Sequence, residues 1–300
     1  MDENFLLEDR LTKIRSINDK HNLLEKSYVS FSGGKDSAVL SALVDLALPG
    51  NKIPRVFVNT GIEYFLLVKF VKESAVKDDR IVIISPKVSI KETLEKYGYP
   101  FKSKEHSEKI SVYQHSGMVK TVRDYLGLGE KKNFLCPEKF KYNFTPDFKL
   151  KCSKKCCEKM KKNPLNNWAK ENSKPISLVG LRKNEGGSRA SLTGCTVFYD
   201  KDCNVLKKFF PLFPVEEDWL NWFVKEHDVR LSELYYPPYN FKRTGCKGCP
   251  FNMKLQQDLD TISMWFPSER KQCEMIWKPV YDEYRRIGKL RKTKSLFDNF

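Results

Sequence analysis

A glycine pair between two apolar segments constrains the fold of this chain more than any other feature. The stretch YVSFSGGKDSAVLSALV, residues 28–44, leads from a β-branched run into a Ser-Gly-Gly-Lys-Asp-Ser turn and out into a helical pattern. Further apolar, β-branched runs at 55–60 and 80–86 alternate with helical patterns. This alternation predicts an α/β fold whose parallel, doubly wound, Rossmann-like sheet is covered on both faces.

The pattern continues beyond residue 100 with one interruption. Residues 101–150 are charged and aromatic, and the clearest short helix there is TVRDYLGLG. PISLVGLR predicts a strand that rejoins the sheet, and TVFYDKDCNVLKKFF predicts a hairpin. We expect two domains: a nucleotide-binding α/β domain at 1–230, with a basic insertion at 101–165, and a small cysteine-containing C-terminal region at 231–300.

Apolar runs and termini argue against a membrane or secreted protein. The longest apolar run, AVLSALVDLAL, is broken by Asp45 and is too short to span a bilayer. The acidic start MDENFLLEDR has no leader pattern, so we expect a cytoplasmic location. Nine cysteines in a reducing compartment indicate metal or iron–sulfur ligation rather than disulfides.

The formal net charge is +16, from 54 Lys+Arg and 38 Asp+Glu, and it favours polyanionic ligands such as nucleotides or nucleic acids. A solvated lysine-rich surface explains the excess equally well.

The glycine turn has the chemistry of a phosphate site. It lies between the first strand and the helix that follows, where parallel sheets bind ligands. Adjacent glycines let backbone amides converge on an anion, and a helix N-terminus adds unpaired amides. We therefore predict phosphate binding rather than an ordinary turn; Lys35 supplies a cation and Asp36 helps to hold Mg²⁺. The predicted phosphate-binding residues are Ser32, Gly33, Gly34, Lys35, Asp36 and Ser37.

The loop is not of the Walker type, because Asp36 follows Lys35 and the upstream glycine is missing. It resembles the SGGxDS loop of the adenine-nucleotide α-hydrolase (PP-loop) superfamily. Four later segments resemble, in order, motifs of the phosphoadenylyl-sulfate (PAPS) reductase family within it. They are FVNTGIEY, VGLRKNEGGSRASL, FFPLFPVEEDWLNWF and LYYPPYNFKRTGCKGCPF.

This resemblance implies an adenine-nucleotide α-hydrolase fold, an adenine nucleotide as ligand and further site residues. We expect a nucleic acid or a sulfur-donor protein as a further partner, and a homo-oligomeric state. Thr60 and Gly61 would lie near the nucleoside, whereas Arg182 and Arg189 would face phosphate or sulfate oxygens, for which their forked donors are suited. Together with Lys35 and Asp36, the two arginines form the predicted catalytic set. The competing interpretation of the arginines is a surface ion pair with Glu185.

Two cysteine groups predict a metal centre. Cys246 and Cys249 have C-x-x-C spacing, and Cys156 and Cys157 are adjacent, with Cys152 nearby. Adjacent cysteines crowd one small ion, whereas a [4Fe–4S] cluster can use both. We predict Cys156, Cys157, Cys246 and Cys249 as cluster ligands, with structural zinc as the second choice and unligated core cysteines as the third. The four histidines show no ligand spacing.

Family resemblance does not determine the reaction. Family reductases use a cysteine on a mobile C-terminal tail, which KLRKTKSLFDNF lacks, and their loop usually departs from SGGxDS. A complete loop favours an enzyme that cleaves ATP between the α and β phosphates, in sulfur metabolism or nucleic-acid thiolation. The alternatives are a PAPS or adenylyl-sulfate reductase, and a non-catalytic nucleotide or nucleic-acid binding module.

Overall fold

The chain forms two compact units. The computed structural model describes residues 2–130, 135–185, 192–200 and 202–291. The first unit comprises Met1–Asn59, Glu63–Pro86 and Asn163–Gly245, and the second comprises Thr60–Ile62, Lys87–Lys162 and Cys246–Phe300. The basic segment after residue 100 thus groups with the C-terminal residues, whereas the sequence attached it to the first domain. The domain boundary at 230/231 stays a prediction.

A six-stranded sheet in the order β3-β2-β1-β4-β6-β5 forms the centre of the first unit. All neighbouring strands pair in parallel except β5 and β6, which form the expected antiparallel hairpin. The fold class predicted from the sequence is therefore confirmed. The strands are β1 (Ser27–Ser30), β2 (Arg55–Val58), β3 (Ile81–Ile84), β4 (Ile176–Leu178), β5 (Thr196–Phe198) and β6 (Leu206–Phe209).

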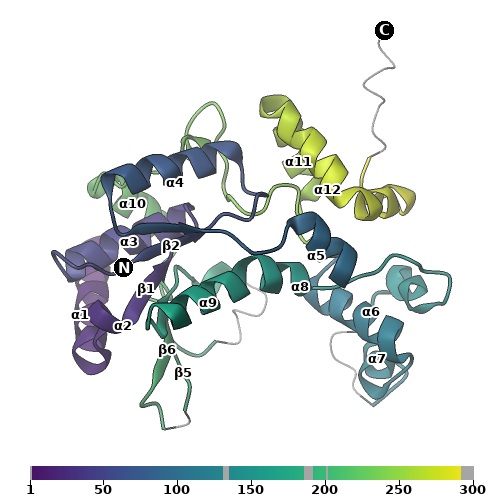
Figure 1. Ribbon diagram of the computed structural model, residues 1–300, viewed down its shortest axis with the longest axis horizontal. Coiled ribbons are helices and arrows are strands. Elements are labelled where there is room, and N and C mark those ends of the chain that lie inside the picture. The colour runs from purple at the N-terminus through teal and green to yellow at the C-terminus, as the bar shows by residue number, and fades with distance from the viewer. Residues whose placement is uncertain (1, 131–134, 186–191, 201, 292–300) are drawn as a thin grey trace. The chain divides into compact units, whose positions relative to one another are not determined.

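Helices cover both faces of this sheet (Figure 1). Helices α3 (Lys35–Ala47) and α4 (Phe65–Lys77) connect β1 to β2 and β2 to β3. Right-handed crossovers in one direction place them on the same face. Helix α9 (Asn163–Glu171) leads into β4 on the other side of β1, and Trp168 meets the Tyr28 ring on the opposite face, at 5.7 Å between centroids.

The face with α3 carries the hydrophobic core. Leu40, Leu43 and Val44 of α3 are fully buried against Val29 of β1 and Leu178 of β4. Their spacing of three and four residues puts them on one side of the helix. The remaining helices of this unit are α1 (Glu3–His21), α2 (Leu23–Lys26) and α10 (Glu217–Glu226).

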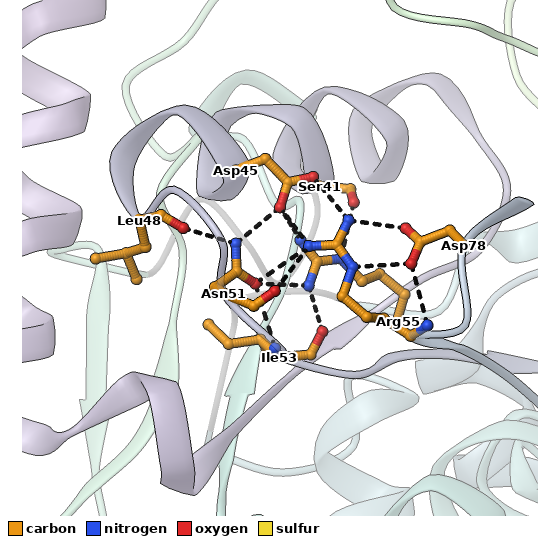
Figure 2. Close-up of polar contacts among 8 residues, drawn as sticks. Ser41, Asp45, Leu48, Asn51, Ile53, Arg55 and Asp78 are labelled. Carbon is orange, nitrogen blue, oxygen red and sulfur yellow. Dashed lines mark hydrogen bonds and ion pairs between the residues drawn. The ribbon is translucent and has the colours of Figure 1, made fainter.

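A network of charges joins the amino ends of β2 and β3 to the end of α3 (Figure 2). The fully buried Arg55 donates Nη2 to Asp45 Oδ1 at 2.6 Å and Nη1 to Asn51 Oδ1 at 2.8 Å. Arg80 donates to Asp45 at 2.7 Å and to Asp78 at 2.8 Å. Burial lowers the pKa of Arg55, although Asp45 partly opposes that shift. The network lies at the sheet edge opposite the glycine turn.

The second unit is helical. One helix in it, α6, was not predicted, because its buried face consists of His106, Ser107 and Ile110 rather than an apolar stripe. The predicted short helix is α7. The described part of the C-terminal tail contains two helices. The helices are α5 (Ile90–Tyr97), α6 (Lys104–Ser116), α7 (Lys120–Tyr125), α8 (Lys155–Cys157), α11 (Leu255–Trp265) and α12 (Pro267–Arg286), with a 3₁₀-helix at Glu138–Phe144 and a π-helix at Glu158–Lys162.

Among the described residues, no helix is both long enough and apolar enough to cross a bilayer.

Candidate nucleotide-binding site

The glycine loop, residues 32–37, joins β1 to α3 in the first unit. Gly33 has φ +72, and a Cβ there would approach Val71 Cγ2 to 2.8 Å. A larger residue at this position would therefore carry both backbone strain and a steric overlap. Glycine allows the chain to turn tightly between the strand end and the packed helix α4.

Two serines hold the loop in shape. Ser37 Oγ donates to Gly34 O at 2.8 Å and accepts from Ser32 N at 3.1 Å. Gly34 N donates to Ser32 Oγ at 3.3 Å. The amides of Gly33, Asp36 and Ser37 donate to no other group in the described part of the chain. Two of these three belong to the first turn of α3, where the helix dipole favours an anion.

Two cations and two carboxylates lie beside the loop. Arg182, just beyond β4, donates Nε to Asp36 Oδ1 at 2.6 Å and Nη2 to Glu217 Oε2 at 2.7 Å. Lys35 pairs with Glu217 Oε1 and donates to Asn221 Oδ1 at 2.9 Å. The four formal charges cancel, so both cations are neutralised by carboxylates of the protein itself.

Glu217, the first residue of α10, is ionised in this arrangement. Burial alone would raise the pKa of its carboxyl, but the hydrogen bond from Lys35 and the positive charges of Lys35 and Arg182 bring the pKa below its usual range. An ionised carboxylate on a lysine and an arginine mimics a phosphate oxygen on the same donors. The site can therefore exchange Glu217 for an anionic ligand.

Two side chains from the segment after α10 pack over the loop. Tyr235 Oη accepts from Lys35 N at 3.0 Å and shares a hydrogen bond with Thr244 Oγ1 at 2.7 Å. A Cβ on Gly34 would lie 3.1 Å from Thr244 Oγ1, and one on Gly180 would lie 2.9 Å from Asp36 O. Gly180 therefore lets the end of β4 pass close to the start of α3.

The structure thus brings Lys35, Asp36 and Arg182 together as the sequence predicted, although their role in catalysis stays a prediction. Arg189 lies outside the described residues. Thr60 and Gly61 group with the second unit, where Thr60 is buried and Gly61 is exposed at φ +80. Their position beside a nucleoside also stays a prediction.

Sequence reasoning missed Glu217, Tyr235, Thr244 and Gly180 as parts of the site. All four lie inside the motif segments that resemble the family. The resemblance therefore marked these segments, but it gave no role to these four positions. Only the fold brings residues so distant in sequence to one loop.

The four predicted cluster cysteines all lie in the second unit. Cys156 and Cys157 belong to α8, whereas Cys246 and Cys249 flank a turn in which Gly248 has φ +60. Three aromatic residues of α12 hold this turn by its carbonyl groups. Trp277 Nε1 donates to Lys247 O at 3.2 Å, Tyr281 Oη to Gly248 O, and Tyr284 Oη to Pro250 O at 3.0 Å.

The four thiols influence one another. The hydrogen bond with Cys157 and burial raise the pKa of Cys156, and the charges of Cys249 and Cys246 add to that shift. Cys157 has its pKa lowered to about 6 by the hydrogen bond with Cys156, against burial, with help from Lys104, Lys161 and Lys162. Within the described ranges, no three His, Cys, Asp or Glu side chains are arranged around one metal ion.

The fold and the glycine loop define a nucleotide-binding α/β protein. A family model described as the phosphoadenosine phosphosulfate reductase domain matches residues 26–127 and 114–295. The chain belongs to this family.

Individual relatives are distant. Uncharacterized protein MJ0973 of Methanocaldococcus jannaschii is 25% identical over 225 residues, which cover 74% of this chain and 40% of that protein. The chain therefore spans about two fifths of the curated relative that it matches.

Two solved structures are similar in fold. The PAPS reductase from Candida auris, in a phosphate complex, is 15% identical with a TM-score of 0.41, covering 73% of this chain and 80% of that one. The U34-tRNA thiolase NcsA from Methanococcus maripaludis with its [4Fe-4S] cluster is 16% identical with a TM-score of 0.39, covering 98% and 84%. Such values are too low to transfer a function.

Proposed function

We propose that this chain binds ATP at the glycine loop and promotes cleavage between the α and β phosphates, with transfer of the adenylyl group to an acceptor. The observation that carries the proposal is the arrangement beside the loop: amides with no internal partner, next to Lys35 and Arg182, both of which Glu217 engages. A phosphate chain supplies the oxygens that all these donors require.

The charge balance suits a polyphosphate with its metal ion. When phosphate oxygens replace Glu217 on Lys35 and Arg182, the carboxylates of Glu217 and Asp36 become available. Carboxylate oxygens are preferred Mg²⁺ ligands, and Asp36 at the start of α3 is the residue expected to help hold the ion. Mg²⁺ would neutralise phosphate charge during the reaction.

The chemical step is a displacement at the α phosphorus. An acceptor oxygen forms the new bond, the bond from the α phosphorus to the bridging oxygen breaks, and pyrophosphate leaves with that oxygen. Lys35 and Arg182 neutralise the charge that develops on the phosphate oxygens, and the loop amides bind the departing pyrophosphate. The intact SGGKDS loop supports this reaction, because a nucleotide without a β,γ-pyrophosphate has less for it to hold.

The cysteines connect this chemistry to sulfur. The influence of four thiols on one another's pKa, two on α8 and two on a turn held by α12, supports a shared [4Fe–4S] cluster, and nearby lysines would offset the charge of the thiolates. The proposed ligands are Cys156, Cys157, Cys246 and Cys249, with zinc as the second choice. A bound cluster would supply a site for sulfur or electron transfer. Sulfur metabolism or nucleic-acid thiolation is the proposed setting, with a nucleic acid or a sulfur-donor protein as partner.

Anaerobically purified protein tests the reaction with ATP, Mg²⁺ and candidate acceptors. Pyrophosphate release together with an adenylylated acceptor, absent in Lys35→Ala and retained in Lys72→Gln, is the expected result. Lys72 is an exposed lysine of α4 that makes no ion pair in the described structure, so it controls for charge loss alone. Equal ATP binding by Lys35→Ala and the unmodified protein would overturn the loop assignment.

The second candidate is a sulfonucleotide reductase, which the description of the matching family favours. Thiol-dependent sulfite release from PAPS or adenylyl sulfate, without pyrophosphate release from ATP, would select it. Nucleotide binding without turnover, with all partners supplied, would select a binding module.

A further inference from the structure

Three lysines of the second unit converge from segments far apart in the sequence. We call Lys102, Lys139 and Lys289 the lysine cluster. Lys102 lies just before α6, Lys139 in the 3₁₀-helix Glu138–Phe144, and Lys289 just after α12. Lys289 interacts electrostatically with both of the others, so the three charges lie close together.

A set of packed aromatic rings supports these ammonium groups. Lys102 Nζ lies 5.1 Å and Lys139 Nζ 5.3 Å from the centroid of the Phe140 ring, and Lys289 Nζ lies 4.1 Å from that of Tyr284. The Phe101 ring contacts both of these rings: its centroid lies 6.2 Å from that of Phe140 and 5.0 Å from that of Tyr284. The ring faces attract the cations, but they do not neutralise them.

The lysine cluster lacks carboxylate partners. Within the described residues, none of its three lysines forms an ion pair, and the groups whose charges oppose the lowering of the pKa of Lys102 are Cys136 and then Glu105. Other lysines of the same unit are paired. Their ion pairs are Lys154–Glu108 at 2.6 Å, Lys141–Glu138 at 2.7 Å, Lys278–Asp282 at 2.6 Å and Lys247–Glu269 at 3.3 Å.

Backbone geometry holds Lys102 in place. Its φ of +58 is in the left-handed region, which costs free energy for a residue with a Cβ. Lys102 N donates to Tyr284 Oη at 2.6 Å, and the preceding Phe101 is fully buried. The surrounding packing thus keeps a strained lysine beside two like charges.

The pKa values of Lys289 and Lys102 agree with this geometry. Burial, followed by the positive charges of Lys139 and Lys102, lowers the pKa of Lys289 to about 8. Burial also lowers the pKa of Lys102, with Lys139 acting in the same direction and Cys136 and Glu105 in the opposite one. A bound anion would remove the unrelieved repulsion among these ammonium groups, of which those of Lys102 and Lys289 are half-buried.

We propose that the lysine cluster binds a phosphate group, at a site formed by residues of the second unit alone and independent of the glycine loop. Three ammonium groups from three segments surround a tetrahedral oxyanion and donate to its separate oxygens, and none of the three is ion-paired with a carboxylate of the described residues. The phosphate comes either from a free phosphate monoester or from the backbone of a nucleic acid, whose charge suits the basic segment at 101–162.

The test uses the full chain and two probes, inorganic phosphate and an oligoribonucleotide without terminal phosphates. Binding is followed by calorimetry and by the NMR signals of His106, which is fully buried and whose pKa burial lowers to about 4, with Lys102 and Lys289 adding to the shift. A bound anion offsets those two charges. It therefore shifts the His106 signals and raises the pKa of His106. Lys35→Ala, which disables the glycine loop, keeps this response.

Matched variants identify the site. Lys139→Gln, Lys289→Met and Lys102→Gly each weaken binding about tenfold, the loss expected for one charged hydrogen bond. Lys102→Gly keeps the backbone conformation that φ +58 requires. The control Lys154→Gln removes an equal charge from an ion-paired lysine of the same unit and changes affinity less than about twofold.

Each outcome is decisive. Binding of inorganic phosphate supports the proposal with a monoester source, and binding of the oligoribonucleotide alone supports it with a backbone source. Binding of neither probe overturns the proposal. A His106 signal that does not respond overturns it too, as do losses for the cluster variants no larger than that of Lys154→Gln.

Discussion

Arg182 donates Nε to Asp36 Oδ1 at 2.6 Å, which ties the end of β4 to the first turn of α3. The same guanidinium reaches Glu217 on α10 with Nη2. One side chain therefore joins three elements at the edge where parallel strands end and ligands bind. A polyphosphate that takes over these donors would change the contacts among all three elements.

Arg182→Gln should weaken ATP binding by about 2 kcal/mol, because charged hydrogen bonds to phosphate are lost. Arg182→Lys should restore only part of this loss, since an ammonium group cannot reproduce the planar fork. Calorimetric titration with ATP and Mg²⁺ measures both. Lys72→Gln is the charge control, and an Arg182→Gln protein that binds ATP as tightly as that control would contradict the assignment.

Gly33→Ala should destabilise the first unit more than Gly50→Ala. Both glycines have nearly the same φ, +72 and +71, but a Cβ at Gly33 meets Val71 whereas one at Gly50 meets nothing within 4 Å. The shared backbone cost is about 1 kcal/mol, and overlap at Gly33 adds about 1–3 kcal/mol. Urea unfolding curves give the two free energies. Equal values would mean that the loop does not need glycine for close packing.

Cys249→Ala should remove most of the iron from anaerobically prepared protein, because the proposed cluster would lose one of its four ligands. Iron analysis and the visible absorbance of the cluster measure the effect. Cys203→Ser is the control, since Cys203 is exposed and lies in the first unit. Zinc in place of iron in the unmodified protein would select the second choice of metal.

His106 should make stability fall in acid. Its ring bonds Tyr125 Oη at 2.9 Å and Asn143 Oδ1 at 3.1 Å, and burial lowers its pKa from 6.5 to about 4. The unfolded chain takes up the proton first, so stability decreases as the pH falls from about 6.5 to about 4, by about 3 kcal/mol in all. Unfolding curves measured across this pH range should show that the free energy of unfolding changes less for His106→Gln than for the unmodified protein. The exposed His115→Gln variant should match the unmodified protein.

Arg55→Met should cost about 3 kcal/mol of stability, because it removes the buried guanidinium that donates to both Asp45 and Asn51, and Arg80 replaces only part of these hydrogen bonds. Thermal and urea unfolding measure the loss. Lys69→Met is the control: Lys69 pairs with Glu233 at 3.4 Å on the surface, and its removal should change stability by less than about 1 kcal/mol. A similar loss for both would show that the network in Figure 2 contributes no more than a surface pair.

Most elements of the first unit were predictable from local pattern. The strands at 27–30, 55–58 and 81–84 and the helices after them follow apolar periodicity, which directly reflects burial. Helix α6 was missed for the same reason. Its buried side includes His106 and Ser107, whose hydrogen bonds to Asn143 and Phe101 come from other segments.

The sequence alone determined the fold class, the glycine loop and the position of Lys35 and Asp36 at a helix start, because each depends on neighbouring residues and on backbone sterics. Only the tertiary structure decided that Glu217 engages both Lys35 and Arg182, and that Lys102, Lys139 and Lys289 meet without an ion-paired carboxylate among the described residues. These relationships depend on contacts between segments that are as much as about 180 residues apart, and such contacts leave no periodic signal in the chain.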